Sequence, residues 1–223
     1  MWKDYKNFVL QESHHALQHK RWTDALILIG YNRLIHYNRM FHTFRLIFRR
    51  FVPVTARLSI TAAAEHYTAS LVYLILSNER IFLKQAHPLF KAVLLYHAME
   101  EIEHKSVCFQ LYQCISGNYL CRFGGFVFST IDLFVNIYLV LRYLLWNDGL
   151  WGFKQQKAVI KLIFGKNGIV KVLIHNILRY LKPSFHPWNT DERAFIKKRV
   201  GLLLSRMEEY KNQFEFAFFS QIG

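Results

Sequence analysis

The sequence is poor in the residues that interrupt or cross-link a chain. Its 223 residues include only 10 Gly and 4 Pro, which excludes collagen-like and low-complexity classes. The three cysteines cannot all pair within one chain and show no Cys-x-x-Cys spacing, which favours a reducing compartment. The first residues lack the apolar run of a secretory signal, so we expect a cytoplasmic protein.

Acidic residues are scarce as well. There are 15 Asp and Glu against 29 Lys and Arg, which gives a formal net charge of +14. Nucleic acid and anionic membranes are the usual partners of such a charge. The sequence has no zinc-finger spacing, no Gly-rich phosphate loop and no RNA-binding strand motif, so we expect no nucleic-acid partner. The basic residues alternate with long aliphatic runs, which favours an anionic membrane surface.

Hydrophobic residues are abundant, at 52% of the chain, which excludes a disordered protein. Their spacing is helical and strand-like alternation is rare, so the sequence predicts an all-α protein. We expect helices over residues 5–29, 53–76, 88–116, 126–146 and 191–219. Gly30 and Gly117 mark two of the helix ends. A variable basic stretch fills residues 31–52.

Residues 126–146 have two interpretations. Sixteen of these 21 residues are apolar, which is enough to span a bilayer. Ser129, Asp132 and Asn136 form one thin polar stripe, and a central Asp is costly in a membrane. The segment is therefore either a core helix of a soluble bundle or a helix in or on a membrane. Further on, Lys154, Lys157 and Lys161 lie beside aliphatic residues, as in a basic amphipathic helix or in the solvated face of a packed one.

Glutamate and histidine concentrate in three short segments. Residues 11–19, 64–67 and 97–105 hold five of the ten Glu and six of the eleven His. Two of these segments contain Glu-x-x-His, formed by Glu12 with His15 and by Glu101 with His104. This spacing places both side chains on one face of a helix. Di-metal bundles take such a pair from each of two helices and one Glu from each of two others.

These segments predict a metal site, with a solvated charged face as the alternative. Apolar residues around the third segment indicate burial, and buried carboxylates are satisfied when they bind a metal. Glu65 lies in an Ala-rich segment and would be a further carboxylate. The expected metal ligands are Glu12, His15, His19, Glu65, Glu101 and His104, with His97 and Glu100 as neighbouring acid–base groups. We expect one or two divalent ions, with iron first and manganese or zinc as alternatives.

Four blocks of the chain resemble the predicted metal-dependent hydrolase family, a ferritin-like helical group. The blocks are Gln11-Glu12-x-x-His15-x-x-x-His19, Glu65-His66, His97-x-x-Glu100-Glu101-x-Glu103-His104-Lys105 and Phe185-His186-Pro187-Trp188. They follow the family's order over about residues 7–190. The resemblance implies a ferritin-like bundle with a metal centre and additional C-terminal helices. The family's usual first ligand helix has no room before Glu12, so we expect a shortened form or a site without that helix.

Three functions stay open at this stage. We expect a metal-dependent hydrolase that activates water to cleave a small apolar or lipid-like substrate. With iron, the same ligands suit a di-iron oxidase or oxygenase. The resemblance to ferritin-like bundles, an argument from fold alone, supports this function. A non-catalytic basic protein on anionic membranes is the third. We expect residues 1–117 to form the metal-binding core and residues 118–223 to pack on the same domain. Whether the chain forms a homo-oligomer stays open.

Overall fold

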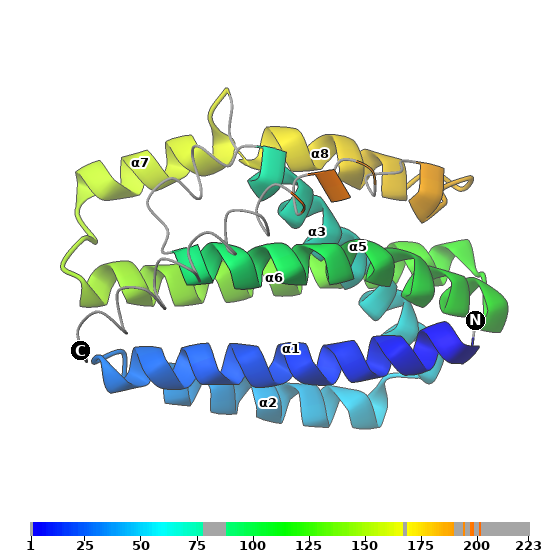
Figure 1. Ribbon diagram of the computed structural model, residues 1–223, viewed down its shortest axis with the longest axis horizontal. Coiled ribbons are helices and arrows are strands. Elements are labelled where there is room, and N and C mark those ends of the chain that lie inside the picture. Colours follow the sequence, from blue (N-terminus) through cyan, green and yellow to red (C-terminus); the bar gives the residue numbers. More distant parts are fainter. Residues whose placement is uncertain are drawn as a thin grey trace, which may run out of the picture.

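The structure, a computed structural model, describes residues 2–77, 88–166 and 169–189, together with residues 194, 197, 198 and 201. Within these residues every regular element is helical (Figure 1). The all-α prediction is therefore confirmed, and the ferritin-like arrangement stays a prediction. The elements are α1 (Trp2–Leu28), α2 (Leu34–Phe51), α3 (Val54–Ser77), α5 (Pro88–Ile115), α6 (Tyr119–Asn147), α7 (Phe153–Phe164), α8 (Ile169–Tyr180) and the 3-10 turn η1 (Pro187–Asn189).

Four of the expected helices correspond to α1, α3, α5 and α6. Gly30 and Gly117 adopt positive φ values of 116° and 60°, which ends α1 and α5 as expected because glycine enters this region without steric cost. Helix α6 begins earlier than expected, where the side chain of Asn118 accepts a hydrogen bond from the backbone N–H of Cys121. The helix expected over residues 191–219 lies almost entirely outside the described residues.

Helix α2 corrects the sequence analysis, which expected no helix within residues 31–52. Its inward side chains are Leu34, Tyr37, Phe41 and Phe48, which recur at helical spacing. Phe48 stacks on Phe128 of α6, with ring centroids 4.6 Å apart. The exposed arginines between these apolar residues hide the period, and tertiary packing against α6 favours the helix.

Helix α3 lies at the centre and packs against both α5 and α6. Small residues allow this close approach: Ala62 and Ala63 are fully buried, and Gly125 of α6 lies against the backbone of Ser59. One core cluster joins Ala63, Tyr67, Phe109, Phe126 and Tyr180. Helix α6 packs on α3 as α5 does. The division of the chain at residue 117 into a metal-binding core and a second part stays a prediction.

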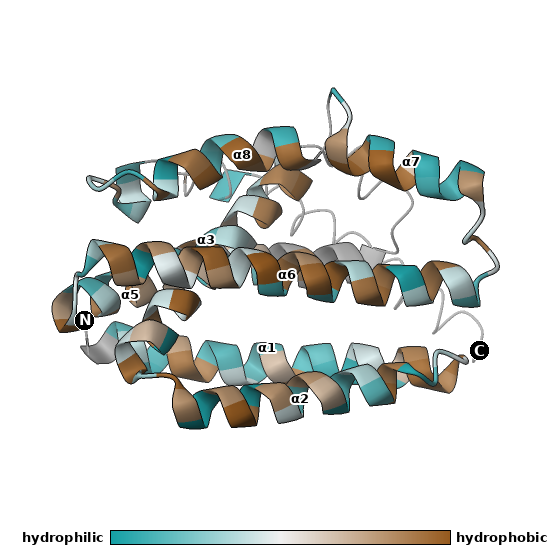
Figure 2. Cartoon of the chain, turned by 180° about the vertical axis from the view of Figure 1, so that it is seen from behind, coloured by the Kyte–Doolittle hydropathy of each residue, from teal (hydrophilic) through white to brown (hydrophobic). Residues whose placement is uncertain are grey.

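Helix α6 is continuous over residues 126–146, as expected, but it is buried on one side alone. Ser129 is buried, and Asn136 donates a hydrogen bond to the Asp132 carboxylate, 2.9 Å away. Only 17% of the residues in its most apolar part are buried, so α6 is not a fully enclosed core helix. It is also the one described helix that is long and apolar enough to cross a membrane. Figure 2 shows that apolar residues make up most of α6.

Candidate metal centre

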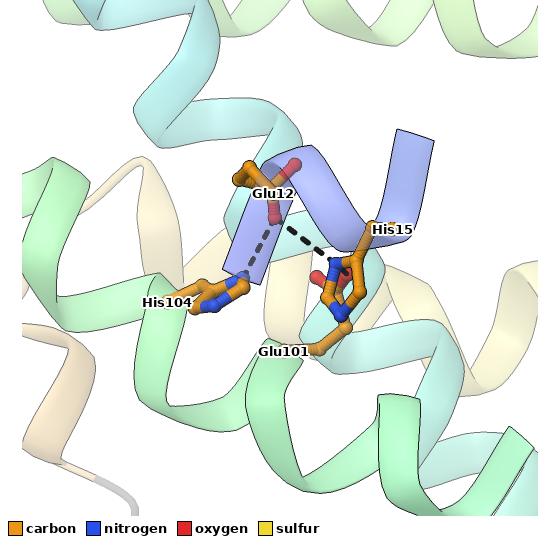
Figure 3. Close-up of side chains that lie close together, drawn as sticks. All are labelled: Glu12, His15, Glu101 and His104. Carbon is orange, nitrogen blue, oxygen red and sulfur yellow. Dashed lines mark hydrogen bonds and ion pairs between the residues drawn. The ribbon is translucent and has the colours of Figure 1, made fainter. Parts of the chain in front are cut away.

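Four titratable side chains from α1 and α5 meet at one point inside the protein. They are Glu12, His15, Glu101 and His104, and one ligand atom of each lies within 4.8 Å of the others. The Glu12 Oε1 atom lies 2.9 Å from His104 Nδ1 and 3.2 Å from His15 Nδ1. Figure 3 shows Glu12 between the two imidazoles, with Glu101 below His15. The i, i+3 spacing on each helix brings each pair to the same face.

The centre is buried on most sides. His104 is 1% exposed, and Glu101 and His15 are buried. The ring of Phe8, from the preceding turns of α1, packs edge-on against His104 at 4.9 Å between centroids. Glu12 and His97 are the more exposed members, with 39% and 21% of their side chains accessible. The centre is therefore most accessible to water beside these two residues.

A hydrogen bond on the outer nitrogen of each imidazole turns the other nitrogen toward the centre. His15 Nε2 lies 2.6 Å from Glu100 Oε2. An ionised carboxylate can only accept, so His15 donates from Nε2. His104 Nε2 lies 3.1 Å from the amide oxygen of Gln11 and donates in the same way. In the tautomer with the proton on Nε2, each Nδ1 has a lone pair on the side of Glu12, as in a metal-binding histidine.

Three polar atoms around this point are buried without a hydrogen bond: Glu65 Oε2, Glu101 Oε2 and His104 Nδ1. Glu65 extends from α3, and its Oε2 lies 3.8 Å from His104 Nδ1. The short contact between Glu12 and His104 lacks hydrogen-bond geometry at Nδ1. Unpaired buried acceptors are costly, and a cation placed among them would satisfy all three. The donor set of carboxylate oxygens and imidazole nitrogens therefore fits a divalent metal.

The electrostatics of the carboxylates point the same way. Burial raises the pKa of Glu65 to about 9, and the neighbouring Glu101 and Glu12 charges add to this. Burial also raises the pKa of Glu101, against a hydrogen bond from Thr68. For Glu12 burial acts upward, but the contacts with His104 and His15 outweigh it and lower its pKa. Carboxylates this close repel one another, and a bound cation would relieve the repulsion.

His97 and Glu100 lie beside the centre, and with His15 they form a second group of ligand-type atoms. His97 Nε2 is 3.3 Å from Glu101 Oε1. Burial lowers the pKa of His97 to about 4, helped by His15 and His19. His19 belongs to neither group found among the described residues. It is exposed at the edge, with its ring 5.5 Å from that of His97, and its role as a ligand stays a prediction.

Two residues of the site were not assigned a role from the sequence. Gln11 accepts a hydrogen bond from His104, and the Thr68 hydroxyl, beside Glu101, lowers the pKa of that carboxyl group. Thr68 lies three residues after Glu65 and so shares its helix face, which is a signal that the sequence does contain. Gln11 and His104 are 93 residues apart, and no local spacing connects them.

Comparison with known proteins gives one match. No curated protein and no solved structure matches the chain. A family model, described as predicted metal-dependent hydrolase, matches residues 1–191. These residues include α1, α3 and α5, which carry the carboxylate and histidine cluster. The chain therefore belongs to the predicted metal-dependent hydrolase family.

Proposed function

We propose that this protein is a hydrolase whose metal ion is held by Glu12, His15, Glu101 and His104, with Glu65 as a further carboxylate. The observation that carries the proposal is the convergence of acceptor atoms without donors between them. Glu65 Oε2, Glu101 Oε2 and His104 Nδ1 are buried and unpaired around one point. In a core that bound no ion, the burial of these three unpaired atoms would destabilise the fold.

Each residue around the ion has a definite task. A divalent metal held there would lower the pKa of water and so make it able to attack an ester or amide at neutral pH. Glu100 accepts a hydrogen bond from His15 Nε2, and Gln11 accepts one from His104 Nε2. These contacts keep both Nδ1 lone pairs aimed inward. His97 is neutral at pH 7 because its pKa is low, so this partly buried imidazole would enter the reaction unprotonated and act as a weak base.

We infer the number of ions from His15, which belongs to both groups of ligand-type atoms. Its Nδ1 faces Glu12, while its Nε2 donates to Glu100. A neutral imidazole offers one lone pair, so His15 could bind a second ion through Nε2 only by losing its remaining ring proton. The arrangement therefore favours one ion, with Glu100 as an orienting partner.

Di-iron oxidation is the second candidate function. The observation that favours it is the second group, formed by His15, His97 and Glu100, which would provide part of another site. Mixed carboxylate and imidazole ligands suit iron and oxygen chemistry. Iron is accordingly the first metal to test, followed by manganese and zinc. A small apolar substrate, such as an acyl ester, remains part of the proposal.

The test uses the full chain loaded separately with iron, manganese and zinc. Metal content per chain is measured first, followed by hydrolysis of chromogenic carboxylic and phosphate esters of increasing chain length. Oxygen consumption is recorded in parallel. We expect about one ion per chain and ester cleavage that Glu101→Ala abolishes. Oxygen consumption with two irons and no cleavage would support the second candidate. A folded protein that takes up no metal would overturn both.

A further inference from the structure

The outer face of α6 is a continuous apolar stripe. Its exposed residues recur every three or four positions, the spacing that keeps side chains on one side of a helix. They are Leu120, Phe123, Val127, Ile131, Phe134 and Tyr138. A surface of this kind is uncommon on a protein that works alone in water, and it indicates an interaction site.

Helices α2 and α8 flank this stripe on its two sides. On one side Phe48 of α2 stacks on Phe128 of α6. On the other side the Tyr119 hydroxyl donates to the carbonyl of Leu181, just after α8, at 2.7 Å. Figure 2 shows the same order, with α6 between α2 and the pair α7–α8. Helix α2, helix α6 and the pair α7–α8 thus lie side by side in this order (Figure 1 and Figure 2).

The flanking helices continue the apolar surface. On α2, four exposed residues at spacings of 4, 3 and 4 form a stripe beside the contact with α6: Met40, Phe44, Ile47 and Phe51. On α7, Phe153, Ile160 and Phe164 form a similar stripe, and Phe153 is 85% exposed. We call these stripes on α2, α6 and α7 the outer apolar face.

The charges around the outer apolar face have one sign. Helices α2, α6, α7 and α8 together contain eleven Lys and Arg and a single acidic residue, Asp132. Asp132 already accepts a hydrogen bond from Asn136. On α7 the residues Lys154, Lys157 and Lys161 are exposed beside the apolar stripe. The surface thus combines exposed aromatic and aliphatic side chains with a strongly positive border.

We propose that the outer apolar face binds the surface of an anionic lipid bilayer. Apolar side chains would enter the boundary between headgroups and acyl chains, while the bordering Lys and Arg contact lipid phosphates, as in interfacial amphipathic helices. Charge complementarity selects this occupant over a second copy of the chain, because two copies would bring the same positive border together. The inner side of α6 packs on α3, and α2 and α7 carry charges along their length, so the protein lies on the bilayer without crossing it.

The proposal gives definite expectations for affinity. Each Lys or Arg near an anionic surface contributes roughly a fivefold gain in affinity, and this gain decreases as salt screens the charges. Apolar contacts depend much less on salt. We therefore expect strong binding to anionic vesicles at low salt, weaker binding at high salt and little binding to neutral vesicles.

The experiment is flotation of the full chain with vesicles of phosphatidylcholine alone, or with about one third phosphatidylglycerol. Ile131→Glu, at the centre of the α6 stripe, should weaken binding to anionic vesicles about tenfold. Lys157→Gln should weaken it about fivefold. The matched control is Leu17→Glu, which places the same charge at an exposed apolar site on α1, and it should change binding less than about twofold.

Circular dichroism and metal content show whether each variant is folded. They also separate this proposal from the metal centre, because metal uptake should be the same in all three variants. Binding that is equal for neutral and anionic vesicles, or absent for both, would overturn the proposal. Light scattering gives the remaining outcome: a dimer that Ile131→Glu dissociates, without vesicle binding, would show that a second copy covers this face.

Discussion

His15 Nε2 and Glu100 Oε2 lie 2.6 Å apart across the contact between α1 and α5, although 85 residues separate them in the chain. This hydrogen bond fixes the rotation of the imidazole and turns Nδ1 toward Glu12 and Glu101. Glu100 and Glu101 are neighbours in sequence, but they take different positions around the same histidine. The contact therefore distinguishes an orienting carboxylate from one that faces the centre.

Loss of Glu101 should remove most of the bound metal. Its carboxylate lies 3.6 Å from His15 Nδ1 and 3.3 Å from His97 Nε2, and Glu101→Ala deletes one wall of the site. We expect the metal affinity of the variant to decrease by more than about a hundredfold, which exceeds the range for residues that only orient a ligand. The purified variant should therefore contain little metal. Elemental analysis after identical purification measures this. Asp24→Ala, which removes an exposed carboxylate of α1 paired with Lys20, should leave metal content unchanged.

Loss of Glu100 should have a smaller effect, because Glu100 acts through His15. We expect Glu100→Ala to weaken metal affinity about 10–100-fold, measured by competition with a chelating dye. Glu100→Gln keeps an oxygen that can accept the Nε2 proton, so it should restore most of the affinity. If Glu100→Ala reduced metal binding as much as Glu101→Ala, and Glu100→Gln gave no rescue, Glu100 would itself be a ligand.

Glu65 should be destabilising until metal binds. Its carboxyl group is buried with Oε2 unpaired, and its pKa of about 9 reflects that cost. In chelator-treated protein at pH 7, Glu65→Gln should raise Tm by about 2–4 °C, equivalent to roughly 1 kcal/mol for a chain of this size. The same variant should lose part of the Tm increase that metal gives the wild-type protein. Differential scanning calorimetry with and without metal tests both effects; a lower Tm for the metal-free variant would contradict the reasoning.

Gly125 should be essential for the packing of α3 on α6. A Cβ at this position would lie 2.1 Å from Ser59 Oγ and 2.8 Å from the Ser59 carbonyl carbon. Because the clash includes backbone, Gly125→Ala should cost at least the roughly 1–3 kcal/mol typical of overpacking. The neighbouring Gly124 has nothing within 4 Å of its Cβ position. Gly124→Ala should therefore raise stability by about 0.5–1 kcal/mol, since alanine favours a helix. Urea unfolding of the two variants should show effects of opposite sign.

The sequence by itself determined the helical class and the two Glu-x-x-His pairs. Both depend on local spacing: residues three apart share a helix face whatever the helix packs against, and Gly30 and Gly117 end helices through their own φ values. For the same reason, α1, α3 and α5 could be expected near their observed limits. Glu65 could be predicted as a partner because it stands in an alanine-rich helix.

Tertiary structure alone decided how each helix is rotated and what it leaves exposed. A rotation of α5 by one position would exchange Glu100 and Glu101, and only the contact with His15 on α1 selects between them. Gln11 reaches His104 because two helices lie side by side, a distance that no local pattern encodes. Helix α2 formed where arginines conceal its period, since burial of Tyr37 and Phe48 against α6 outweighs local preference. The apolar pattern of α6 is the same for a buried and for an exposed helix, and its neighbours determine which side stays exposed.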